Sequence, residues 1–327
     1  MKRFWTWSAV VVGILGLTYF VRQFDLPALR TQLAELPPTL ILVVPLIGIA
    51  ITMSTISWAE SFPQLSDSHR PTLWHLFWIR LGGEAINNAL ASAYVAGEPV
   101  KGMLAARHGA SPAAAYASAL IGKTAFICGE VVFLLIGLVF AAFRFGGASP
   151  IVTMLVTVTA AGAAVVALGI VLQRRRLVGR GARLLQTLRL GRRAMWERTL
   201  PRADAIDQAV HHYYHHQRGR FVIAVLWAAG GWLAGTVEIY LFLALLTPAP
   251  DPVVLAIVLE SGVAVAKGLS FFVPGSYGAQ EGAITWLFVT TGLSPELGVT
   301  YAVLRRCREF CWIGLGFASL WYYTRRR

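Results

Sequence analysis

Long apolar stretches recur along this chain and constrain its fold more than any other feature. Residues 149–173, for example, contain no charged side chain and end at a cluster of arginines. At about 1.5 Å per residue, such a helix crosses the ~30 Å hydrocarbon core of a bilayer. With 56% hydrophobic and 14% charged residues, the 327-residue chain has the composition of a polytopic membrane protein. We therefore predict an all-α membrane fold.

Six stretches are predicted to be full transmembrane helices: 5–21, 39–59, 113–143, 149–173, 220–246 and 298–323. We interpret the first as an uncleaved anchor, because no small-residue cleavage site follows it. Residues 1–327 would then form one integral membrane domain.

Two further apolar stretches, 73–97 and 252–293, do not fit a simple crossing. A loop with Pro and Gly at 274–282 interrupts the second one, and about 12 apolar residues follow it, fewer than the ~17 that a spanning helix needs. The first ends in small residues before Glu98. Irregular backbone at membrane depth survives only where protein or a wet cavity satisfies its amides. We therefore predict two re-entrant hairpins.

The arginines set the predicted orientation. Twelve arginines and three acids lie between Arg174 and Arg220, which places nine of the thirteen net positive charges there. A basic excess beside membrane helices marks the cytoplasmic side, so 174–219 is predicted to be a cytoplasmic loop. Counting helices from it puts both termini and the loop that holds Lys101 in the cytoplasm. The hairpin 73–97 then enters from the cytoplasm, and 252–293 enters from outside.

This layout predicts an inverted repeat. Residues 39–143 and 220–323 each contain a span, a hairpin and a span, in opposite orientations. Transporters are often built this way, with a site near the middle of the membrane. The alternative is a set of eight ordinary spans.

Polar side chains inside the apolar stretches form the candidate site, because a charge at the centre of the bilayer costs roughly 2.5 to 3.5 kcal/mol on insertion scales. We expect these side chains to line one cleft where the hairpins meet. With the Pro and Gly residues of the second loop, the candidate residues are Arg80, Glu84, Asn87, Asn88, Glu98, Lys101, Lys123, Glu260, Lys267, Pro274, Gly275, Gly278, Glu281, Arg305, Arg306 and Glu309.

Two pairs of these residues are spaced for ion pairing along their own helices. Arg80 and Glu84 lie four residues apart, as do Arg305 and Glu309. Such pairing is a purely structural explanation of these four charges.

Arg306 and Lys267 lack a same-helix partner at that spacing. We expect them to bind an anion, and phosphate is the anion that a membrane offers. Glu281 has two interpretations, which the sequence leaves open: it caps the backbone amides of its own hairpin, or it binds or carries a proton during transport.

Several functional classes are disfavoured. The chain has no P-loop, nucleophile elbow, metal-protease helix or dinucleotide-binding motif, so we expect no catalytic residue, cofactor or metal. The histidines of 211–216 lie four apart but have no acid or Cys nearby, and we interpret this segment as an interfacial helix. No aromatic surface for reading bases accompanies the basic charge, so nucleic acid is not an expected partner.

Three motifs give the chain a resemblance to a known family. They are Asn87-Asn88 with residues 93–101, the loop 274–282, and the helix segment 304–309. Over residues 5–323 the chain resembles the lysylphosphatidylglycerol synthase transmembrane, or flippase-like, family, nearest its hopanoid-associated branch. The resemblance implies lipid movement across a bacterial inner membrane. The cytosolic synthase domain of the fused enzymes has no counterpart here, so the resemblance implies a stand-alone flippase-like protein.

The sequence is compatible with three functions. The first, which we predict, is a transporter that moves a lipid or a lipid-linked headgroup, with a phosphate or another polar group, between leaflets. The second is a membrane-embedded transferase that uses the same acids. The third is an accessory scaffold for hopanoid or glycolipid biosynthesis, whose basic loop binds anionic lipid or a cytosolic enzyme.

Overall fold

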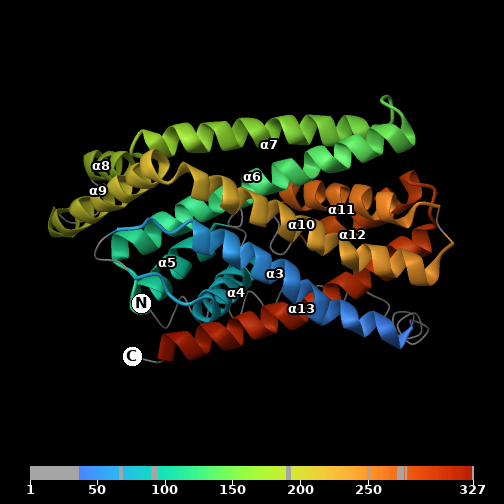
Figure 1. The fold of residues 1–327 in the computed structure, drawn as a ribbon, viewed down its shortest axis with the longest axis horizontal. Coiled ribbons are helices and arrows are strands. Elements are labelled where there is room, and N and C mark those ends of the chain that lie inside the picture. The colour runs from blue at the N-terminus through green and yellow to red at the C-terminus, as the bar shows by residue number, and fades with distance from the viewer. Residues whose placement is uncertain are drawn as a thin grey trace.

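The computed structural model describes residues 37–65, 69–89, 95–188, 193–248, 250–270, 276 and 278–325. These residues form one 3-10 helix and a bundle of α-helices, with no strand among them (Figure 1). The elements are η1 (Pro38–Leu42), α3 (Val43–Glu60), α4 (Leu73–Ala89), α5 (Gly97–Arg107), α6 (Pro112–Phe145), α7 (Pro150–Arg174), α8 (Leu177–Thr187), α9 (Arg193–His216), α10 (Arg218–Leu246), α11 (Pro252–Leu269), α12 (Ala279–Thr290) and α13 (Pro295–Arg325).

The prediction of an all-α polytopic membrane protein is confirmed. Within the described ranges, five helical segments are long and apolar enough to cross a membrane: η1 with α3, then α6, α7, α10 and α11. The predicted span 298–323 corresponds to α13, which is not among these five, and the predicted span 5–21 lies outside the described residues.

Local signals in the sequence set the ends of α6 and α7. Ser111 and Ser149 each precede a proline, and each hydroxyl accepts a hydrogen bond from a backbone amide three residues later, at 3.3 Å. This combination is a strong helix start, because the cap satisfies an open N–H and proline suits the first turn. Gly146 ends α6 with a φ of 78°, a conformation that glycine adopts without strain.

The first hairpin consists of α4 and α5. The ring of His75, near the start of α4, lies 5.3 Å from the ring of His108, just beyond α5. The chain therefore returns to the end from which it entered. The predicted boundary at residue 97 was wrong, because the returning arm is α5 itself. Lys101 is consequently not in a loop but in this helix, with only 4% of its surface exposed.

A glycine contact explains how the two arms fit together. A Cβ atom placed on Gly97 would lie 2.1 Å from the carbonyl oxygen of Gly83, closer than any real side chain allows. Only two glycines permit this approach of backbone to backbone. The Oδ1 atom of Asn87 also accepts a hydrogen bond from the Gly97 amide at 2.7 Å.

The second hairpin consists of α11 and α12. By length and composition α11 alone qualifies as a span, but α12 packs back along it, with Leu287 against Gly262. Gly278 precedes α12 with a φ of 80°. Pro274 and Gly275 lie outside the described residues.

Helix α13 connects the two hairpins. It has 31 residues, and at 1.5 Å per residue it is about 46 Å long. Its first turn packs on α12, with Gly298 against Phe288, and its last turns pack on α4, where Ser319 donates to the carbonyl of Trp78 at 2.8 Å. The hairpins therefore enter from opposite ends of α13, as Figure 1 shows. The internal repeat of 39–143 and 220–323 stays a prediction.

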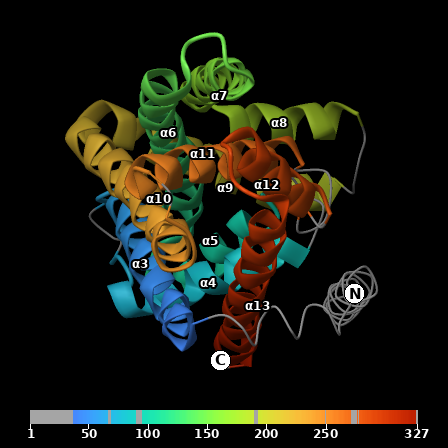
Figure 2. The ribbon, with the colours of Figure 1, turned by 90° about the vertical axis from the view of Figure 1, so that its right-hand side faces the viewer.

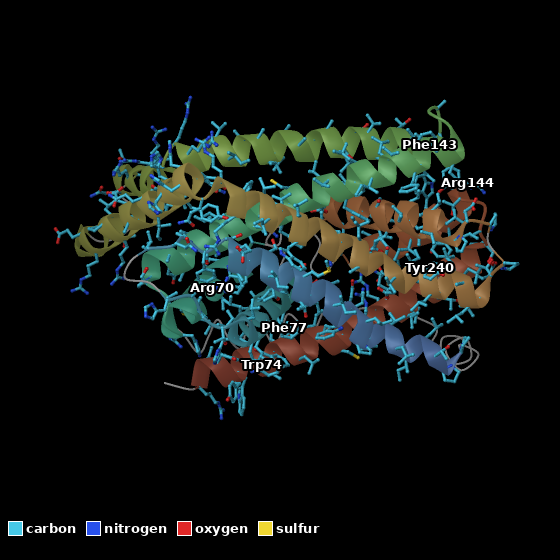
Figure 3. All side chains as sticks on the ribbon, in the orientation of Figure 1. Arg70, Trp74, Phe77, Phe143, Arg144 and Tyr240 are labelled. Carbon is cyan, nitrogen blue, oxygen red and sulfur yellow. The ribbon has the colours of Figure 1, made fainter. Side chains whose placement is uncertain are left out.

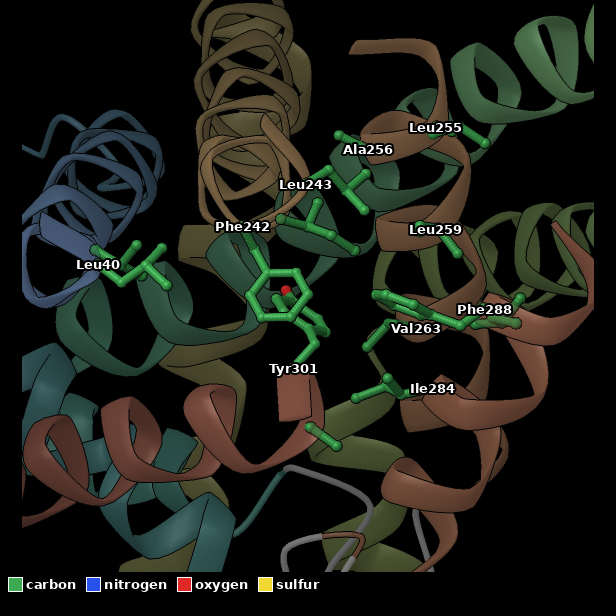
Figure 4. Close-up of a cluster of buried hydrophobic side chains, with 14 of the residues drawn as sticks. Leu40, Phe242, Leu243, Leu255, Ala256, Leu259, Val263, Ile284, Phe288 and Tyr301 are labelled. Carbon is green, nitrogen blue, oxygen red and sulfur yellow. The ribbon is translucent and has the colours of Figure 1, made fainter. Parts of the chain in front are cut away.

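A cluster of buried rings fixes the second hairpin against α10 and α13 (Figure 4). The ring of Tyr301 lies 5.1 Å from that of Phe242 and stacks at 5.8 Å on that of Phe288. All three side chains are fully buried. Because such interiors are closely packed, the cluster also fixes Arg305, one turn further along α13.

Exposed aromatic side chains mark both ends of the bundle. Trp74 on α4 is 67% exposed and Phe143 on α6 is 87% exposed, and they lie toward opposite ends of the molecule (Figure 3). Aromatic rings gather at the two interfaces of a membrane, so these residues fit headgroup depth.

The segment 174–219, predicted as a loop, consists largely of the helices α8 and α9. They pack together through Ala182 on one side and Trp196 and Ala203 on the other. Figure 2 shows α8 lying across the axis of α7.

Candidate functional site: a charged cavity between the hairpins

A cavity of about 210 Å³ lies between α3, α4, α11 and α13. Its polar wall comes from both hairpins and from the middle of α13. The charged residues of this wall are Arg80, Glu84, Lys267, Arg305, Arg308 and Glu309. Its apolar wall includes Ile47 and Ile51 of α3 and Trp312 of α13.

Arg305 is held by an acid of the second hairpin. Its two terminal nitrogens donate to the two carboxylate oxygens of Glu260 at 2.6 and 3.0 Å, and one of them also donates to the Tyr301 hydroxyl at 3.1 Å. Both partners of the ion pair are almost fully buried, with side-chain exposures of 7% and 5%. A bidentate pair of this kind fixes the guanidinium in one orientation. The contact of Arg305 with Glu309, which the spacing along α13 predicted, is longer, at 3.7 Å. It is therefore weaker than the contact with Glu260.

Arg306 ties the tip of the second hairpin to α13. Its Nε donates to the carboxylate of Glu281, and one terminal nitrogen donates to the Ser276 carbonyl at 3.1 Å. The other terminal nitrogen donates to Glu309 at 2.7 Å. Arg306 has no partner four residues away, but its partner Glu309 lies three residues away, a spacing that also brings side chains together. Glu281 closes the hairpin onto α13 through this arginine.

Glu309 is the centre of the charge network. Four cations place a nitrogen within 4.0 Å of its carboxylate: Lys267, Arg305, Arg306 and Arg308. Its side chain is 13% exposed, and a buried carboxylate of this kind needs such partners to offset the loss of water.

The first hairpin contributes a second group of charges. Glu84 lies 3.6 Å from Arg80, which confirms their pairing along α4, and 3.8 Å from Lys101. Lys101 also lies 2.7 Å from Glu98. With Lys123 of α6, these four side chains line a small cavity of about 10 Å³, roughly the space of one water molecule.

The wall of the larger cavity has more cations than acids. Arg80, Lys267, Arg305 and Arg308 face two carboxylates, those of Glu84 and Glu309. In Arg80, Arg305 and Arg308 the Nε–H has no hydrogen-bond partner among the described residues. Unused buried donors are costly. These three Nε atoms are buried, and Glu260 and Glu238 behind the wall pair with Arg305 and Arg308, so the anion-facing groups are the terminal nitrogens and Lys267.

The structure brings together most of the candidate residues predicted from the sequence. Arg80, Glu84, Asn88, Lys267, Arg305 and Glu309 line the larger cavity. Eight others contact residues of its wall or the network behind it: Asn87, Glu98, Lys101 and Lys123 around Glu84, and Glu260, Glu281, Arg306 and Gly278, which precedes α12, at the second hairpin. Their role in transport stays a prediction.

Two residues were missed. Arg308 lines the cavity, and its terminal nitrogen lies 3.2 Å from the buried carboxylate of Glu238 on α10. Arg308 is three residues from Arg305 and so shares its helix face, which was a usable signal in the sequence. Nothing in the spacing of Glu238 indicated its partner.

Metal coordination has no support in the described ranges of the chain, where no group of three or more His, Cys, Asp and Glu side chains is placed to hold an ion. The rings of His211 and His215 lie 4.2 Å apart on α9, outside the cavity.

Comparison with protein-family models matches residues 6–316 to the lysylphosphatidylglycerol synthase TM region. The match covers the three motifs at 87–101, 274–282 and 304–309. No curated protein and no solved structure matched the chain.

Proposed function

The chain belongs to the lysylphosphatidylglycerol synthase TM region family, which makes it a multi-pass membrane protein involved in lipid handling, and we propose that it moves a lipid or lipid-linked headgroup between the leaflets of a bacterial inner membrane. The observation that supports this proposal most is the charged cavity, to which two hairpins from opposite ends of the bundle both contribute. Opposed hairpins that meet at one polar site are the geometry of alternating access.

The size and chemistry of the cavity favour a headgroup as the bound part. Pockets for drug-sized ligands measure about 300–1,000 Å³. At about 210 Å³ the cavity holds less than a whole lipid. The four cations of the wall favour a phosphate, which arginine binds through paired hydrogen bonds. Ile47, Ile51 and Trp312 give the opposite wall an apolar surface, along which acyl chains can stay in lipid.

The ion pairs suggest how binding is coupled to opening. A phosphate that enters beside Lys267 and Arg308 competes with Glu309 for the same cations, since both contact that carboxylate within 4.0 Å. Glu309 also shares Arg306 with Glu281, so this competition loosens the contact that holds the second hairpin on α13. The new phosphate contacts offset the cost of separating buried charges.

Leaflet exchange in proteoliposomes tests the proposal. Fluorescent lipids with anionic, zwitterionic and neutral headgroups are reconstituted with the full chain, and their transfer between leaflets is followed by quenching from outside. Lys267→Gln is the informative variant, because the Lys267 side chain, at 29% exposure, is the least buried of the four cavity cations. Losing one charged contact, worth about 1.5–3 kcal/mol, is expected to slow exchange of a phosphate-bearing lipid by roughly 10- to 100-fold.

Arg198→Gln is the matched control. Arg198 is an exposed arginine of α9, and it does not line the cavity. We expect it to leave exchange unchanged. Exchange no faster than in empty liposomes, for every headgroup, would refute the proposal. A new lipid species in the mass spectrum would favour the transferase instead.

A further inference from the structure

Helix α8 begins where a membrane-spanning helix ends. Its first residue, Leu177, follows the end of α7 at Arg174 by three positions, and α8 then lies across the axis of α7 (Figure 2). The last turn of α7 before its arginines is apolar and exposed, with Val171 at 45% and Leu172 at 37%. Such a surface on a spanning helix faces lipid. A helix that turns sideways at this point lies near the level of the headgroups.

One face of α8 is apolar and uncovered. Ala182 packs against α9, but Leu184, Leu185 and Leu188 are 61%, 45% and 59% exposed. At 3.6 residues per turn Leu184 and Leu188 share one side of the helix, and Leu185 lies beside them toward Ala182, at the edge of the surface that packs on α9.

The protein holds this apolar face in a fixed position. The carboxylate of Asp207 on α9 accepts hydrogen bonds from the amides of Val178 and Gly179, at 3.1 and 2.7 Å. Further along, Arg183 donates to Asp204 at 2.6 Å. The first-turn amides of a helix need such a cap. These hydrogen bonds and the ion pair hold α8 on α9.

Basic side chains surround the leucines. Arg175, Arg176 and Arg180 are exposed beside them, and Figure 3 shows nitrogen-bearing side chains gathered over α8 and α9. An apolar helix side flanked by arginines is the pattern of helices that lie in a membrane surface. Arginines near such a surface are attracted to anionic lipid.

We propose that α8 is a membrane-surface helix, whose leucines insert at headgroup depth while the neighbouring arginines bind anionic phospholipid of the adjacent leaflet. The leucines follow directly on a spanning helix whose last turns are apolar and exposed, which favours lipid over a protein partner as their occupant. The inference does not depend on the cavity or on the transport proposal.

Site-directed fluorescence on the full chain tests this inference. After Cys128, Cys307 and Cys311 are replaced by serine, bimane is attached to Leu185→Cys or, as the matched control, to Gln186→Cys. Gln186 is the adjacent exposed residue and points away from the leucine face. Each protein is reconstituted in vesicles of phosphatidylcholine, with and without phosphatidylglycerol, and quenched by doxyl lipid or by aqueous iodide.

In the anionic vesicles we expect doxyl lipid to quench the label at 185 and iodide to spare it, with the reverse at 186. Arg175→Gln and Arg180→Gln should each weaken this protection by about fivefold, because an arginine near the surface contributes about that factor. Thermal stability and gel filtration establish that each variant is folded.

Two results would overturn the inference. One is equal access of iodide to both labels in anionic vesicles. The other is a label at 185 that is protected from both quenchers in either lipid, which would show that a protein covers the leucines.

Discussion

The ion pair between Glu260 and Arg305 should contribute far more to stability than an exposed ion pair of the same length. Replacing Glu260 with Gln leaves a buried guanidinium without its counter-charge and faces it with an amide donor. Removing one partner of a buried pair costs about 3–5 kcal/mol. Arg183 and Asp204 provide the comparison, because their N–O distance is also 2.6 Å, while their side chains are 53% and 37% exposed. Water screens that pair, so Asp204→Asn should cost about 0–1 kcal/mol.

Thermal unfolding of both variants in one detergent, followed by tryptophan fluorescence and gel filtration, measures the difference. Glu260→Gln should lower the midpoint several-fold more than Asp204→Asn. Adding Arg305→Met should recover much of the loss, because an apolar pair often replaces a buried ion pair at little cost. Two results would refute the importance of burial. One is an equal midpoint for Glu260→Gln and Asp204→Asn, and the other is a double variant no more stable than Glu260→Gln alone.

Two further predictions concern close packing and surface charge. Gly97→Ala should destabilise the protein by about 1–3 kcal/mol, because the added Cβ meets the Gly83 carbonyl; the thermal midpoint measures this loss, and Gly169→Ala, with open space around it, should cost nothing. His211→Gln should raise the pKa of His215, because the charge of His211 is the main cause that lowers this pKa. A lowered histidine pKa disfavours protonation of the folded state, so acidification should destabilise the end of α9 less in this variant than in the parent protein. NMR titration of the His215 imidazole measures the pKa, and an unchanged pKa would contradict the prediction.

The local signals in the sequence were sufficient for part of the candidate site. The spacing of Arg80 and Glu84 predicted their contact, and the spacing of Arg306 and Glu309 would have predicted theirs had separations of three been counted with separations of four. The partners of Arg305 and Arg308 could not be found in this way. Glu260 and Glu238 lie on other helices, 45 and 70 residues away, and their pairing depends on how those helices pack.

In the first hairpin too, some features follow from the local sequence and others depend on how the helices pack. Its apolar arm at 73–89 was recognisable, but α5 contains Glu98, Lys101 and Arg107 and has the composition of a surface segment. It lies inside because Lys101 contacts both Glu84 and Glu98, and because Gly97 fits against Gly83. These contacts offset the cost of burying the charges of α5, and only the tertiary structure shows them.

The sequence by itself determined that the chain is a helical membrane protein with two interrupted apolar segments, because the length of an apolar run and the demand for backbone hydrogen bonds in lipid are local properties. Only the tertiary structure decided which charges share the cavity, since a buried ion pair forms where packing brings a nitrogen and a carboxylate oxygen from two helices within about 4 Å, whatever their separation along the chain.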